Sequence, residues 1–160
     1  MTSRARLDSG GPGETRRLGQ RLGRLLRAGD VVLLSGELGA GKTVLVQGLA
    51  RGMGYQGSAS SKSFVLLGEY AGQRGKLYHA DLYRLEAPEQ AAELGLAETC
   101  ADGALAVEWP ERADGVFPAD ALNVRFEVTG QRTRTLRLQA RGPRSRELLA
   151  GVTGRARAGR

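Results

Sequence analysis

One eight-residue segment limits what this chain can fold into more than any other feature. Residues 36–43 read G-E-L-G-A-G-K-T and match the phosphate-binding motif G-x-x-x-x-G-K-[ST] at every fixed position. The motif works between a buried strand and a helix, because the curled backbone and the helix N-terminus together point N–H groups at phosphates. An apolar run at 31–34 and helically spaced apolar residues after 43 supply both flanks. The segment therefore predicts a strand–loop–helix unit.

Each fixed position of the motif has its own predicted task. Gly36 and Gly41 let the backbone curl tightly, since glycine tolerates positive φ. Lys42 is expected to reach the β- and γ-phosphates of a nucleotide, and the Thr43 hydroxyl to bind Mg²⁺. The predicted phosphate-binding residues are those of the whole loop: Gly36, Glu37, Leu38, Gly39, Ala40, Gly41, Lys42 and Thr43.

Apolar spacing predicts further helices and strands on both sides of this unit. A helical stripe with arginines opposite begins at Thr15, and short helices are expected at 88–94 and 144–149. Alternating or continuous apolar runs predict strands at 64–70, 76–83, 104–107, 122–128 and 136–139. We therefore expect an α/β fold of the P-loop NTPase type, with three layers, a mostly parallel central sheet and antiparallel hairpin additions.

The domain organisation follows from length and from local composition. A chain of 160 residues favours one domain with its own core. Residues 1–13 end in Gly10-Gly11-Pro12-Gly13 and are expected to form a flexible lead-in. Residues 14–141 would form the P-loop domain, and residues 142–160 a basic C-terminal helix and tail. The small polar residues of 54–63 predict a mobile loop.

Composition excludes several classes of protein. Cys100 is the only cysteine, so neither an internal disulfide nor a metal site of several cysteines is possible. The N-terminus has no signal-peptide pattern, and no apolar run is long enough to span a bilayer. We therefore expect a cytoplasmic protein without a membrane partner.

The net charge of +7 is concentrated at the two ends of the chain. Residues 132–160 hold nine arginines against Glu147, and residues 1–30 hold seven arginines against three acids. Residues 31–131 hold 8 basic and 13 acidic residues. Basic ends are consistent with attraction to RNA or to an acidic partner, and equally with a solvated, arginine-biased tail. Both interpretations remain open.

Two carboxylates are candidates to complete the site. Hydrolysis of a nucleotide needs a carboxylate for the metal ion and a positioned water. Asp81 and Glu108 each follow an apolar strand-like run, and ligands of open α/β sheets lie at the carboxyl ends of strands. With Lys42 they are the candidate catalytic residues, and either acid is able to bind the metal or orient the water. A salt bridge with Arg84 is a rival role for Asp81, and His79 is interpreted as a packed strand residue.

Several separated segments carry a resemblance to one family. They are Glu14-Thr15 with Leu18-Gly19, Gly29-Asp30, the loop 36–43, Lys62-Ser63-Phe64, Tyr70, the H-A-D-L-Y-R run at 79–84 and Glu108-Trp109-Pro110-Glu111. In this order, over about residues 14–140, the chain resembles TsaE (YjeE-type), the small bacterial P-loop ATPases of tRNA threonylcarbamoyladenosine biosynthesis. Lys62 stands where the family usually has proline, which removes a fixed φ and adds a charge.

The resemblance implies more than the residues do alone. It implies an ATPase with ATP and Mg²⁺ as cofactors, working with the TsaB and TsaD proteins. We expect slow hydrolysis by the chain alone, because no obvious arginine finger or dedicated water-holding residue stands out in the sequence. That assembly modifies adenosine 37 of tRNAs reading codons that begin with A, so the tRNA contact would be indirect, through the complex. By position, Thr43 and Glu108 look like the Mg²⁺ ligands, Asp81 like a catalytic or water-positioning acid, and Thr15 like a nucleotide contact. Trp109 would flank the site.

Two other functions fit the same loop. A small P-loop kinase would transfer the γ-phosphoryl group of ATP to a metabolite, and would need an acceptor pocket and usually an arginine-bearing lid. Residues 86–120 hold nine acids against Arg112, which disfavours such a lid there. A binding module would use the nucleotide only as a switch, or hold tRNA with its basic ends.

Overall fold

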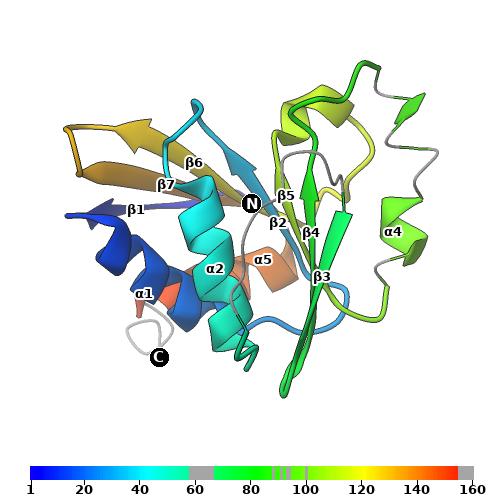
Figure 1. Ribbon diagram of the computed structural model, residues 1–160, viewed down its shortest axis with the longest axis horizontal. Coiled ribbons are helices and arrows are strands. Elements are labelled where there is room, and N and C mark those ends of the chain that lie inside the picture. The colour runs from blue at the N-terminus through cyan, green and yellow to red at the C-terminus, as the bar shows by residue number, and fades with distance from the viewer. Residues whose placement is uncertain (58–66, 88, 91, 93–94, 100, 155–160) are drawn as a thin grey trace.

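A seven-stranded mixed sheet organises the molecule, in the order β1-β7-β6-β2-β5-β4-β3 (Figure 1). The computed structural model describes residues 1–57, 67–87, 89–90, 92, 95–99 and 101–154. The strands are β1 Ser3–Ser9, β2 Val31–Ser35, β3 Leu67–Gly72, β4 Gly75–Asp81, β5 Ala104–Glu108, β6 Leu122–Val128 and β7 Arg134–Ala140. The helices are α1 Pro12–Gly23, α2 Lys42–Gly52, α4 Leu96–Thr99, the 3₁₀ helix η1 Pro110–Ala113 and α5 Pro143–Thr153.

The centre of the sheet is parallel and its flanks are antiparallel. β2 pairs in parallel with both β5 and β6, and β4 pairs in parallel with β5. β3 joins β4, β7 joins β6, and β1 joins β7, each antiparallel. β5 is buried at every position, as its continuous apolar run requires of a strand covered on both faces. The predicted α/β class, with its parallel centre and hairpin additions, is confirmed.

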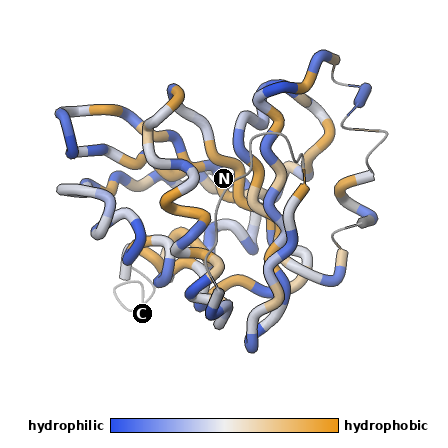
Figure 2. The backbone as a smooth tube through the Cα atoms, viewed as in Figure 1, coloured by the Kyte–Doolittle hydropathy of each residue, from blue (hydrophilic) through white to orange (hydrophobic). Residues whose placement is uncertain are grey.

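Helices α1, α2 and α5 cover one face of the sheet. Their apolar residues share one core cluster with inward residues of β2, β5, β6 and β7. Leu49 of α2, Leu148 of α5 and Leu34 of β2 belong to this cluster. A second cluster lies on the other face, where Leu82, Leu96 and others pack on β4 and β5. Figure 2 shows the hydrophobic stretches along the central strands and α2. The phosphate-binding motif thus lies between a strand buried on both sides and a helix packed in the main core.

Close packing of α1 on α2 fixes the direction of the helix that follows the motif. A Cβ added to Gly48 would lie 2.2 Å from the carbonyl oxygen of Arg16, and one on Gly19 would lie 2.5 Å from that of Leu45. Only glycine permits backbones to approach this closely.

The prediction of a flexible lead-in over residues 1–13 is wrong. Residues 3–9 form β1, whose seven residues each have a register partner in β7. Ala5 and Leu7 pack against the main core, while Arg4 and Arg6 point outward. Ala5 and Leu7 are the only apolar residues of this strand, too few to show a clear strand period, and its pairing with β7 is not visible in the local sequence. α1 then begins at Pro12, a favoured residue in a first helical turn.

The C-terminal helix is longer than the sequence predicts. The helix predicted at 144–149 extends over Pro143–Thr153, and Leu148, Leu149 and Val152 are buried in the main core. The predicted 88–94 helix and the 54–63 loop fall largely outside the described residues. So do Lys62, the first residues of the strand predicted at 64–70 and residues 155–160. Within the described part of the chain, no helix is both long and apolar enough to cross a membrane.

Candidate functional site

The glycine loop, residues 36–43, curls between β2 and α2 as its sequence predicts. Gly36, Gly39 and Gly41 have positive φ angles of 136°, 80° and 111°. A Cβ on Gly36 would also lie 2.9 Å from the carbonyl oxygen of Phe126. The N-cap of α2 is Gly41, and within the described residues no side-chain hydrogen bond caps this N-terminus, whose first N–H groups lack partners inside the helix. Such an N-terminus favours an anionic ligand.

Lys42 is a buried cation over this loop. Its ammonium donates a hydrogen bond to the carbonyl oxygen of Gly36 and lies 3.7 Å from the ring centroid of Trp109. Burial lowers the pKa of the Lys42 ammonium, and the nearby carboxylates of Glu108, Glu111 and Asp81 oppose that shift. The side chain is therefore held beside the loop, where an anion would restore the solvation that its burial removes.

Glu108 meets the loop from the end of β5. Its carboxylate oxygens lie 3.3 and 3.2 Å from the hydroxyl oxygen of Thr43. Oε2 also lies 2.6 Å from Nε2 of His79, and both side chains are about 95% buried. The predicted pair Thr43–Glu108 is brought together, with His79 as a third partner.

Asp81 lies next to Glu108 because β4 and β5 pair in register at these two residues. It is half-buried, and its Oδ1 accepts a hydrogen bond from the backbone N–H of Tyr83 at 3.0 Å. Arg84 is exposed and forms no ion pair with Asp81 or any other described residue. The salt bridge considered for Asp81 is thus not present in the described structure.

A cavity of about 440 Å³, here named the strand-end cavity, joins these groups. Trp109 forms part of its wall, and its ring lies 5.0 Å from that of Tyr83. Trp109 also has φ 60°, uncommon for a bulky residue, as the chain turns from β5 into η1. The lining residues are Leu38, Gly39, Gly41, Lys42, Thr43, Val44, Asp81, Tyr83, Arg84, Glu108 and Trp109.

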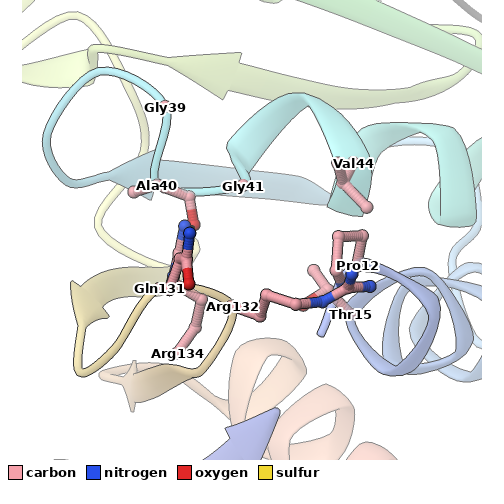
Figure 3. A pocket seen from close by; sticks show the side chains of 9 residues that line it. All are labelled: Pro12, Thr15, Gly39, Ala40, Gly41, Val44, Gln131, Arg132 and Arg134. Atoms are coloured by element: carbon pink, nitrogen blue, oxygen red, sulfur yellow. The ribbon is translucent and has the colours of Figure 1, made fainter. Parts of the chain in front are cut away.

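A second cavity, of about 270 Å³, lies on the other side of the loop and is named the hairpin cavity (Figure 3). Arg132 extends from the β6–β7 hairpin toward Pro12 and Thr15, and Arg134 Nε donates to the carbonyl oxygen of Ala40 at 3.0 Å. Thr15 is buried, and its hydroxyl lies 2.7 Å from that of Ser9. The cavity is lined by Pro12, Thr15, Gly39, Ala40, Gly41, Val44, Gln131, Arg132 and Arg134. Gly39, Gly41 and Val44 line both cavities, so the two cavities flank the same loop.

The donor atoms fit a hard divalent cation. Thr43 and Glu108 offer oxygen ligands within hydrogen-bond distance of each other, and Mg²⁺ is bound by one or two protein oxygens together with phosphate and water. No group of three or more His, Cys, Asp or Glu residues that could hold a metal ion occurs in the described part of the chain. The site therefore suits a cation that a bound phosphate helps to hold.

Sequence reasoning missed four residues that the structure places here. The sequence favours a packed role for His79. Its position two residues before Asp81 was the available signal, because alternate residues of a strand lie on the same face. Gln131, Arg132 and Arg134 are far from the loop in sequence. They reach it only because the sheet order places the β6–β7 hairpin beside β2, and no local signal in the sequence shows that order.

Comparison with known proteins supports one family. Residues 10–136 match a protein-family profile described as "Threonylcarbamoyl adenosine biosynthesis protein TsaE". A tRNA threonylcarbamoyladenosine biosynthesis protein TsaE from Streptomyces coelicolor is 42% identical over 115 residues, which are 70% of this chain and 78% of that one. The protein of the same name from Treponema pallidum is 40% identical over 125 residues, 77% of this chain and 91% of that one.

A solved structure extends the likeness to three dimensions. The crystal structure of YdiB from Bacillus subtilis superposes with a TM-score of 0.80 at 27% identity, covering 98% of both chains. The family match includes the glycine loop, Asp81 and Glu108. With the profile covering most of its length, the chain belongs to the TsaE family.

Proposed function

We propose that this protein binds and hydrolyses ATP with Mg²⁺ and thereby supports formation of threonylcarbamoyladenosine at position 37 of tRNAs, acting with the TsaB and TsaD proteins. The names of its relatives supply the pathway. The observation that carries the chemistry is the meeting of Lys42, Thr43, Asp81 and Glu108 at the strand-end cavity beside the glycine loop.

The two cavities support an assignment of the nucleotide's parts. The triphosphate would lie along the loop, where backbone N–H groups, the α2 N-terminus and Lys42 offer positive charge. The adenosine would then occupy the hairpin cavity beside Thr15 and Arg132, and the γ-phosphate the strand-end cavity.

The residues divide the work of hydrolysis. Lys42 and the loop N–H groups hold the phosphate oxygens and stabilise the charge that develops on them. Mg²⁺, bound through Thr43 and Glu108, would neutralise part of that charge. Asp81 orients a water whose oxygen bonds to the γ-phosphorus as the bond to the ADP oxygen breaks, and the water's proton passes to Asp81 or to the released phosphate. His79 holds the Glu108 carboxylate in place.

The isolated chain is expected to turn over slowly. Arg84 is exposed and, among the described residues that line the strand-end cavity, it is the only arginine. Stabilisation of the transition state by an arginine is worth about 10³–10⁵ in rate when it is correctly placed. TsaB and TsaD would therefore accelerate the reaction by ordering Arg84 or by supplying another cation.

Release of inorganic phosphate, measured with and without TsaB and TsaD, tests this function. We expect slow release by the chain alone, faster release with both partners, and loss of both in Lys42→Ala. Lys76→Ala removes the same charge from a half-buried site at the start of β4, outside the residues that line either cavity, and serves as the matched control. Fast release by the isolated chain would contradict dependence on partners. Phosphate appearing on a metabolite instead of in solution would favour the kinase.

A further inference from the structure

One flank of the sheet, formed by β1, β7 and β6, has exposed side chains on the face opposite α1, α2 and α5. The apolar residues of β1, β7 and β6 face the core that these strands share with α1, α2 and α5. They include Leu7, Val124, Phe126, Leu136 and Leu138. The alternate residues of these strands therefore lie on the opposite face. There Arg4, Arg6, Arg125 and Arg137 are all exposed, at the flank of the sheet where β1 is the edge strand (Figure 1).

Three of these arginines stand in one row across the strands. Arg6 is the register partner of Arg137, and Arg137 is the partner of Arg125. Neighbouring strands lie about 4.8 Å apart, so the three side chains start within roughly 10 Å. Like charges directly opposite each other destabilise a sheet. The row is therefore a cost to the fold unless an anionic partner compensates it.

Internal acids balance this face only in part. Asp8 accepts a hydrogen bond from Arg6 at 3.2 Å, and Glu127 accepts one from Arg137. Three other arginines of this flank form no ion pair with any described residue. They are Arg4, Arg125 and Arg141, which lies just beyond β7. These three guanidinium groups are available for phosphate, which arginine binds through two parallel hydrogen bonds, and the solvent-exposed pairs of Arg6 and Arg137 are weak enough to be exchanged for it.

A cavity of about 350 Å³ opens at the end of the row. Ser35, the register partner of Arg125, lines it together with Asn123 and Arg141. Half-buried Phe117 adds an aromatic ring. Amide, hydroxyl and aromatic groups recognise an unstacked base. Glu111 and Asp114 also line this cavity, and their negative charge makes it less suitable for a phosphate.

We propose that this face binds single-stranded RNA directly, with phosphates along the row Arg6–Arg137–Arg125 and one unpaired base in the adjoining cavity. Among the residues that the structure describes, this cavity shares no lining residue with the strand-end or hairpin cavities, so the site does not rest on ATP hydrolysis. A nucleic-acid strand is favoured over an acidic protein, because it brings charges in a line next to a base. The contact adds a direct route to the tRNA where the resemblance implies an indirect one.

The test compares the wild-type chain with the triple variant Arg6→Gln, Arg125→Gln, Arg137→Gln. The probes are an unmodified tRNA, a single-stranded 12-mer RNA, its duplex and polyglutamate, each measured over a range of salt concentrations. Arg17→Gln, Arg27→Gln, Arg51→Gln removes the same charge from exposed helix and turn positions and is the matched control. Thermal melting and ATP binding check that each variant is folded.

We expect the row variant to bind single-stranded RNA at least about tenfold more weakly. Its slope of log K against log salt should fall by about 2, because each single-strand phosphate contact contributes about 0.7. Asn123→Ala should weaken the single strand but not the duplex. Equal RNA binding by the row variant and the control would overturn the proposal. So would polyglutamate binding without RNA binding, which would assign the face to an acidic protein.

Discussion

At the scale of single residues, the Glu108 carboxylate is held by two partners of different kinds. Thr43 approaches it from the glycine loop and His79 from β4, and all three side chains lie at the ends of elements that the parallel sheet brings together. A buried carboxylate needs such partners, since an unpaired charge is expensive to bury. The His79 contact at 2.6 Å fixes which way the remaining oxygen points.

His79→Phe should therefore weaken metal-dependent nucleotide binding, whereas His79→Gln, which keeps a hydrogen-bonding group, should recover part of it. Loss of a partner that orients a metal ligand typically costs about 10–100-fold in metal affinity or activity. The measurement is the Mg²⁺ concentration that half-saturates binding of a fluorescent ATP analogue. Equal values for wild type and His79→Phe would show that the contact only packs the core.

At the scale of elements, the position of the loop depends on how α2 packs against α1. The contact is made at Gly48, where an added Cβ would lie 2.2 Å from a carbonyl oxygen. Gly48→Ala should lower the free energy of unfolding by about 1–3 kcal/mol, the usual cost of overpacking. Gly13→Ala is the control, since its Cβ would meet only the end of the Arg17 side chain at 3.7 Å. Urea denaturation compares the two, and similar stabilities would contradict tight packing here.

A second element, α5, is held at its N-terminus by a residue outside the helix. Asp120 accepts hydrogen bonds from the backbone N–H groups of Arg144 and Ser145 at 3.0 and 2.8 Å. Hydrogen bonds from Ser145, helped by those from Arg144, lower the pKa of the Asp120 carboxyl below its ordinary 3.8. The carboxylate therefore stabilises the fold above pH 3.8, and its contribution is lost as the pH falls through the lowered pKa.

Asp120→Ala should accordingly cost about 1 kcal/mol at pH 7, as loss of a helix cap usually does. The difference from wild type should shrink at strongly acidic pH, where the wild-type carboxyl is protonated. Urea denaturation of both proteins over a pH series measures it. A difference that stays constant from pH 7 down to pH 2 would show that the charge contributes nothing.

At the scale of the whole molecule, the fold brings the two basic ends of the chain together and gives their arginines different environments. Arg144 forms two hydrogen bonds with the buried carboxylate of Asp30, and Arg134 holds the loop at Ala40. Arg137 and Arg141 lie on the exposed flank with Arg4 and Arg6. The basic charge is thus partly structural and partly available at the surface, a division that the sequence left open.

The same arrangement explains which parts of the fold and of the site could be predicted from the sequence. The loop 36–43, the strand before it and the acids at 81 and 108 were predictable, because each follows from a local motif or a buried run. β1 was missed because its own apolar pattern is weak, and its pairing with the distant strand β7 cannot be seen in the local sequence. Arg132 and Arg134 were missed because only the strand order brings them to the loop. Their roles depend on contacts between distant segments, which periodicity does not encode.

Calorimetric titration of ATP into wild type, Lys42→Ala and Lys76→Ala, each with Mg²⁺ and with EDTA, tests the proposed nucleotide site most directly. We expect wild type and Lys76→Ala to bind alike and more tightly with Mg²⁺, and Lys42→Ala to bind at least about tenfold more weakly, about 1.4 kcal/mol. ATP binding by Lys42→Ala as tight as by wild type would show that the glycine loop is not where the triphosphate lies.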